Sequence, residues 1–140
     1  MIKVLIVEDD IVQSRLYREW LASGLRPSSG VLVQLVSNGQ EAASILNSNM
    51  FDVTVMDLAL PYIPGPELIE RYRANMGRLL VASSFADFYG RMRPNALVDG
   101  VLQKPLNQDM LIHELKRFIR SDVYADQRPD FPREVYTAIA

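Results

Sequence analysis

Four apolar runs of this chain each end in residues that could do chemistry. One ends in Glu8-Asp9-Asp10 and another in Asp57, and two more end in Ser83-Ser84 and Lys104-Pro105. Grouped carboxylates can hold a cation, and a single carboxylate can act as a nucleophile. We expect these four ends to converge on one site in which Asp57 is the nucleophile.

Each of these residues also has a structural alternative. Acids that follow a strand often cap the next helix, and we assign that role to Asp10. Ser84 competes with Ser83 as the functional hydroxyl, because serine is common in turns. His113 is the only histidine and is expected on the surface. With no cysteine in the chain, this composition argues against a zinc site.

The strands that must position these residues follow from short apolar runs. Strands are expected at 2–7, 31–36, 79–82 and 98–103, with one more ending at Asp57. Because helical segments separate them, the pattern predicts an α/β fold with a five-stranded parallel sheet and helices on both faces. Asp57 would then lie at the carboxyl end of a buried strand, where open α/β sheets bind their ligands.

The helices are less evenly marked. Val12, Leu16 and Trp20 recur at a spacing of four and predict the inner stripe of the first helix. Asn107 can cap the last helix, whose apolar pattern stops at Ser121. Residues 85–97 contain a glycine and a proline, so we expect at most two helical turns there.

Composition bounds the function. The chain has 140 residues, of which 49% are hydrophobic and 23% charged, and its net charge is −2. These values fit one soluble domain and give no indication of a nucleic-acid or membrane surface. The absence of cysteine excludes a disulfide scaffold and fits a reducing compartment. The first apolar run is too short for a signal peptide or a membrane span, so we expect a cytoplasmic protein.

Four motifs in order resemble the receiver domain of two-component response regulators. They are the acidic pair after the first strand, Asn38-Gly39-Gln40-Glu41-Ala42, the stretch from Asp52 through Pro61 with Gly65, and Gln103-Lys104-Pro105. The resemblance covers residues 1–121 and leaves 122–140 as a tail or linker. It implies a flavodoxin-like sheet with strand order 2-1-3-4-5.

The resemblance also implies roles for individual residues. Asp57 would accept a phosphoryl group, and Mg²⁺ (or Mn²⁺) would be held by Glu8, Asp9, Asp57 and the backbone carbonyl of Ala59. Lys104 and the hydroxyl of Ser83 would bind phosphoryl oxygens, with Ser83 acting as the switch. The bond between Lys104 and Pro105 would be cis.

A phosphorylation-activated switch that acts through protein contacts is the function that the resemblance implies. The donor would be a histidine kinase or a histidine phosphotransfer protein, and the target is unknown. The chain would catalyse at most its own phosphorylation and slow dephosphorylation and would otherwise not be an enzyme. The reason is that Ala59 stands where an aspartyl phosphatase carries a second acid. The alternative is a receiver-fold adaptor that works without phosphorylation. A flexible tail is favoured over a docked or dimer-forming one, and a homodimer is left open.

Two features depart from the receiver pattern. Val101 stands where an aromatic residue usually reports phosphorylation, and the fourth helix is expected to be poorly formed. We therefore expect output through another surface, the first helix or the tail.

Ala59 and Phe85 occupy positions that influence how water reaches the acyl phosphate, and neither can orient a water molecule. This predicts slow loss of the phosphoryl group.

Overall fold

The computed structural model describes residues 1–25, 30–84 and 98–125. Its elements in chain order are β1 (Ile2–Val7), α1 (Ile11–Gly24), β2 (Val31–Val36), α2 (Gly39–Ser48), β3 (Val53–Asp57), α3 (Gly65–Tyr72), the short 3₁₀ helix η2 (Arg73–Asn75), β4 (Arg78–Ser83), β5 (Gly100–Gln103) and α5 (Gln108–Ala125). The expected segments at 85–97 and 126–140, Phe85 included, lie outside the described residues. No described helix is both long and apolar enough to cross a membrane.

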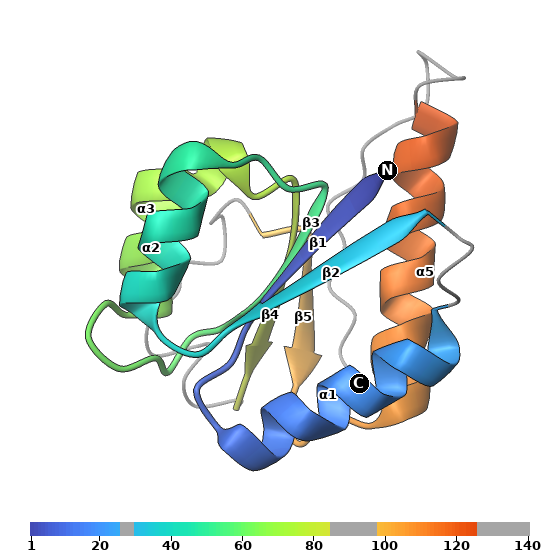
Figure 1. Cartoon of the computed structure of the whole chain (residues 1–140), viewed down its shortest axis with the longest axis horizontal. Helices are drawn as coiled ribbons and strands as arrows, with labels where there is room; N and C mark the ends of the chain where they lie inside the picture. The colour runs from blue at the N-terminus through green and yellow to red at the C-terminus, as the bar shows by residue number, and fades with distance from the viewer. Residues whose placement is uncertain (26–29, 85–97, 126–140) are drawn as a thin grey trace.

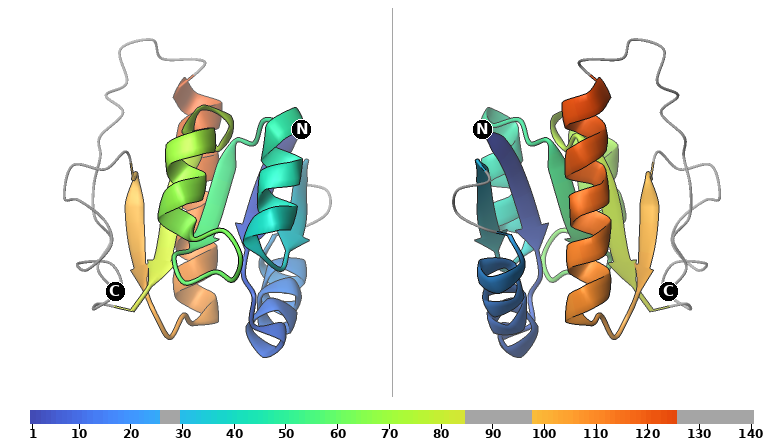
Figure 2. Two further views of the ribbon diagram at one scale, coloured as in Figure 1. Left: turned by 90° about the vertical axis from the view of Figure 1, so that its left-hand side faces the viewer. Right: turned by 90° about the vertical axis from the view of Figure 1, so that its right-hand side faces the viewer.

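The strands form one parallel sheet in the order β2-β1-β3-β4-β5 (Figure 1). This confirms the fold class and the strand order that the resemblance implied. Helices α2 and α3 cover one face of the sheet, and α1 and α5 cover the other (Figure 2). All five residues of β3 are buried, as a central strand with both faces covered requires, whereas the edge strand β2 alternates in exposure.

Alternation along the strands divides the apolar residues between two cores. On β1, Val4 and Ile6 face α1 and α5, whereas Leu5 and Val7 face α2 and α3. The same alternation on β3 directs Val53 and Val55 toward α1 and α5. Side chains two residues apart on a strand share a face, so Asp57 continues the face of Val55.

Local capping explains where three helices begin. The Gln13 N–H donates to Asp10 Oδ1 at 3.0 Å, and the Met110 N–H donates to Asn107 Oδ1 at 2.9 Å, so both predicted caps are confirmed. Asn38 caps α2 in the same way, and Glu41 reaches back to the N–H of Ser37. These contacts hold the starts of α1, α2 and α5 close to the strand ends.

The predicted inner stripe of α1 was wrong at Val12, whereas Leu16 is half-buried and Trp20 packs against the core. Val12 is 65% exposed, whereas Tyr17 and Leu21 are buried. The first turn of α1 lies beyond the strand ends, so its apolar residues have no sheet to pack against (Figure 2). The buried stripe therefore starts in the second turn, one residue away from the stripe that the spacing suggested.

Three boundaries differ from the sequence prediction. β5 begins at Gly100 rather than at residue 98, and β4 already includes Arg78. Helix α5 continues to Ala125, four residues past the point where its apolar pattern stops. Helical backbone can continue past the end of an apolar pattern because its hydrogen bonds are made within the helix.

Candidate functional site

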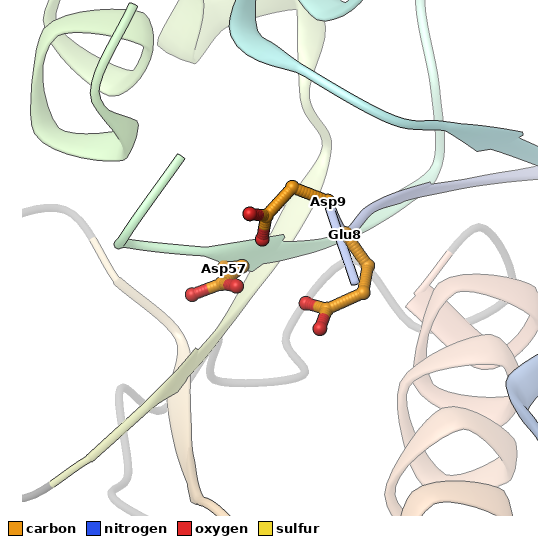
Figure 3. A group of neighbouring side chains, drawn as sticks. All are labelled: Glu8, Asp9 and Asp57. Carbon is orange, nitrogen blue, oxygen red and sulfur yellow. The ribbon is translucent and has the colours of Figure 1, made fainter. Parts of the chain in front are cut away.

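The ends of β1, β3 and β5 bring the predicted chemical residues to one edge of the sheet. The carboxylates of Glu8, Asp9 and Asp57 gather there, each offering one oxygen, and these oxygens lie within 4.8 Å of one another (Figure 3). They line a pocket of about 520 Å³ with six further residues: Asp10, Gln13, Ala59, Lys104, Pro105 and Leu106. The predicted convergence is thus confirmed for the acids and the lysine.

Lys104 supplies the positive charge of the pocket. Its Nζ lies 2.7 Å from Asp57 Oδ2 and 3.3 Å from Glu8 Oε2, so one ammonium group serves two buried carboxylates. The Lys104 N–H donates to the Ser83 carbonyl at 2.9 Å, which fixes the start of the loop after β5 against β4. The Lys104–Pro105 peptide bond is cis, as the resemblance implied.

Backbone contacts hold Asp57 from the other side. The Ala59 N–H donates to Asp57 Oδ1 at 3.0 Å, so both carboxylate oxygens have a donor. The Gly65 N–H donates to the Leu58 carbonyl at 3.2 Å. A Cβ at Gly65 would lie 2.8 Å from Leu58 Cα and 2.9 Å from the Asp57 carbonyl oxygen, so only glycine lets α3 start this close to Asp57.

Burial and neighbouring charges together shift the pKa values of the pocket. Burial raises the pKa of Glu8 to about 8, and the neighbouring Asp57 adds to this, while Lys104 opposes it. Burial also raises the pKa of Asp9, followed by the charge of Asp57. Burial alone would lower the pKa of Lys104, but its hydrogen bond to Asp57 and the charge of Glu8 outweigh that effect and raise it. Three carboxyl groups thus share one lysine among the residues that line this pocket.

A hard divalent cation fits this donor set. Among the described residues this group consists of three carboxylates and includes no histidine or cysteine, and carboxylate oxygens are the ligands that Mg²⁺ or Mn²⁺ prefers. Ala59, whose carbonyl was predicted as a ligand, lines the same pocket.

Two of the predicted residues stand apart from the acids. Ser83 is buried, but its hydroxyl donates to the Ser84 carbonyl at 2.7 Å, and Ser83 is not among the described residues that line the pocket. Val101 is half-buried and packs against the core beneath α2 and α3. His113 is exposed, as expected.

Sequence reasoning missed three residues at or behind the pocket. Gln13 and Leu106 line it. Tyr17 is 2% exposed and packs in the same apolar core as Leu106. The spacing of Tyr17, Leu21 and Gly24 marks the true inner stripe of α1, and this was the signal that the sequence offered.

Comparison with known proteins agrees with this geometry. The family model for the response regulator receiver domain matches residues 4–116. The probable transcriptional regulator ycf29 of Porphyra purpurea is 28% identical over 124 residues, which are 85% of this chain and 57% of that protein. The sensor histidine kinase AruS of Pseudomonas aeruginosa is 31% identical over 79% of this chain and 11% of its own length. The chain thus spans about half the length of the ycf29 regulator.

A solved structure extends the agreement to the fold. The receiver domain of sensor histidine kinase PA1611 from Pseudomonas aeruginosa PAO1, which holds a magnesium ion in its active-site cleft, superposes with a TM-score of 0.70 at 26% identity over 85% of this chain and 98% of its own. Fold, pocket and sequence agree, and the chain belongs to the response regulator receiver family of two-component signalling.

Proposed function

We propose that Asp57 accepts a phosphoryl group in the presence of Mg²⁺ and that the chain thereby acts as a switch. The observation that carries this proposal is the 2.7 Å contact between Lys104 and Asp57 beside three carboxylates whose oxygens lie within 4.8 Å of one another. Phosphoryl transfer needs positioning and charge neutralisation more than covalent assistance, and this pocket offers both.

The residues divide the work of the transfer between them. An oxygen of Asp57 forms the new bond to phosphorus while the bond from phosphorus to the donor atom breaks, leaving an acyl phosphate. Glu8, Asp9 and Asp57 would hold the cation, which would supply positive charge to neutralise the group being transferred. Lys104 moves from the Asp57 carboxylate to a phosphoryl oxygen. The Ala59 N–H keeps the other side of Asp57 in place.

The donor that we propose is a histidine kinase or a histidine phosphotransfer protein, and the output acts through protein contacts. Because Val101 cannot serve as an aromatic reporter, we propose that α1 or the tail carries the output. Arg15 and Arg18 are exposed on α1 and would belong to that surface. Unchanged affinity for a target protein after replacement of both arginines would count against α1.

We also propose that the chain has no other enzymatic activity and loses its phosphoryl group slowly. Ala59 is exposed at the pocket and carries no polar atom on its side chain that could orient an attacking water molecule. Timing the loss of phosphate from the purified phosphoprotein tests this, and a half-life of seconds would refute it.

Labelling with a small acyl phosphate tests the main proposal. The wild-type protein should take up phosphate only with Mg²⁺ present, and Asp57→Asn should take up none. Asp52→Asn is a matched control, since Asp52 lies before the same strand but accepts from the Lys3 N–H at 2.8 Å, away from the pocket. A wild-type protein that remains unlabelled would favour the phosphorylation-independent adaptor. The valine at position 101, where an aromatic residue is usual, also favours that alternative.

A further inference from the structure

The hydroxyl group of Tyr17 is buried in the core beneath α1 and α5. The side chain is 2% exposed, and its hydroxyl has no hydrogen-bond partner among the residues that the structure describes. A buried hydroxyl without a partner is destabilising, so each such group in a native protein calls for an explanation. The Tyr17 hydroxyl is therefore a hydrogen-bond donor that donates to none of the described residues.

The place of Tyr17 is close behind the acidic pocket. Tyr17 lies one turn after Ser14 on α1, and the Ser14 hydroxyl donates to the Glu8 carbonyl at 3.2 Å. Tyr17 shares its core with Leu106, which lines the pocket. Alternation along β1 places Glu8 on the same face as Ile6, which is the face that α1 covers. Burial raises the pKa of Tyr17, and the charges of Glu8 and Asp57 raise it further, so this hydroxyl stays a proton donor.

Glu8 is the group that will need a donor. It is 2% exposed, and both of its carboxylate oxygens accept from Lys104, at 3.3 and 3.4 Å. Lys104 is shared with Asp57, to which it is much closer. In the proposed function Lys104 turns to a phosphoryl oxygen and Mg²⁺ would occupy one carboxylate oxygen of Glu8. The other oxygen would then lose its hydrogen bond, at a large cost for a buried acceptor.

We propose that Tyr17 is a positioning residue whose hydroxyl donates to the Glu8 carboxylate once Lys104 has turned to the phosphoryl group on Asp57. This inference rests on the proposed function and deepens it. Each group supplies what the other lacks in that state, the tyrosine a proton and the carboxylate an acceptor. The ring must move to make the bond, because the Tyr17 hydroxyl has no acceptor within reach in the described part of the chain.

Trp20 would report that movement. Its ring centroid lies 5.7 Å from that of Tyr17, at an interplanar angle of 49°. Trp20 is half-buried one turn further along α1, and it is the single tryptophan of the chain. A shift of the tyrosine ring changes the surroundings of this one indole. The change in the pocket is thereby transmitted to α1, although position 101 is a valine and not an aromatic residue.

The test compares wild type, Tyr17→Phe and a control in the unphosphorylated state and with Mg²⁺ plus beryllofluoride, which stands in for the phosphoryl group. Tyr72→Phe is the control, since it deletes the hydroxyl of a half-buried tyrosine on the opposite face of the sheet. The melting temperature, the Trp20 emission and the dissociation constant for beryllofluoride are measured for each protein. Asp57→Asn shows that beryllofluoride acts at Asp57.

Opposite effects in the two states are expected for Tyr17→Phe. Without beryllofluoride it should melt at the wild-type temperature or a few degrees above it, because it removes an unpaired hydroxyl. With beryllofluoride its dissociation constant should rise about tenfold, because a hydrogen bond to a charged group is lost. The change in Trp20 emission should disappear, while Tyr72→Phe keeps it.

Two results overturn the inference, and they differ. If the wild type binds beryllofluoride and Tyr17→Phe behaves like it in both states, or is changed equally in both, the tyrosine has only a structural role. If the wild type binds no beryllofluoride at Asp57, the proposed function fails and this inference fails with it.

Discussion

Raising the pH should destabilise the metal-free protein, and Glu8 should account for most of the loss. The pKa of Glu8 is raised from its ordinary value of 4.5 to about 8, first by burial and then by Asp57. Between these two values the folded protein keeps a proton that the unfolded chain has released. Stability therefore falls as the pH rises through this window, and the contribution of Glu8 to stability is greatest below the lower value.

The size of the effect follows from the same values. A carboxyl group that is protonated only in the folded state costs at most about 1.4 kcal/mol of unfolding free energy for each unit of pH. Across two units, from about pH 5.5 to about pH 7.5, the loss should reach about 2–3 kcal/mol. That is a large share of the stability of a domain of this size.

Urea denaturation at a series of pH values measures this loss. Glu8→Gln cannot titrate at this position, so the difference between wild type and Glu8→Gln isolates the one group. Glu70→Gln, an exposed acid on α3, should retain the wild-type slope. Because Mg²⁺ binds deprotonated carboxylates, saturating Mg²⁺ should flatten or reverse the dependence. Parallel curves for wild type and Glu8→Gln would refute the reasoning.

Three further substitutions have expected outcomes. Lys104→Met should lower the unfolding free energy by about 2–3 kcal/mol, because it removes the 2.7 Å ion pair of the buried Asp57; denaturation that matches the wild type would contradict this. Asp9→Asn should raise the unfolding free energy by about 0.5 kcal/mol, because it relieves repulsion between carboxylates at an exposed site. Calorimetry should show that the same variant binds Mg²⁺ more weakly. A destabilised variant would argue against repulsion between these carboxylates. Thr54→Val should cost about 1–2 kcal/mol, because the buried Thr54 hydroxyl donates to the Met76 carbonyl at 2.8 Å, and an unchanged urea midpoint would speak against that bond.

The sequence alone was enough to place the acids and the lysine at the strand ends. Strand periodicity and the polar residues that end each apolar run are local features, and parallel strands bring their carboxyl ends to one edge of the sheet. The order of the strands needed the resemblance as well, because periodicity contains no information about which strands are neighbours. The caps at Asp10 and Asn107 were also local and were found correctly.

Only the tertiary structure decided which groups meet and how. It showed that Lys104 serves both Glu8 and Asp57, and that the Ser83 hydroxyl turns to its neighbour's carbonyl. It also placed Tyr17 in the core instead of Val12. The physical reason is the same in each case: the face that a helix buries, and the partner that a polar atom finds, depend on elements far away in the chain, and spacing along one segment cannot specify them.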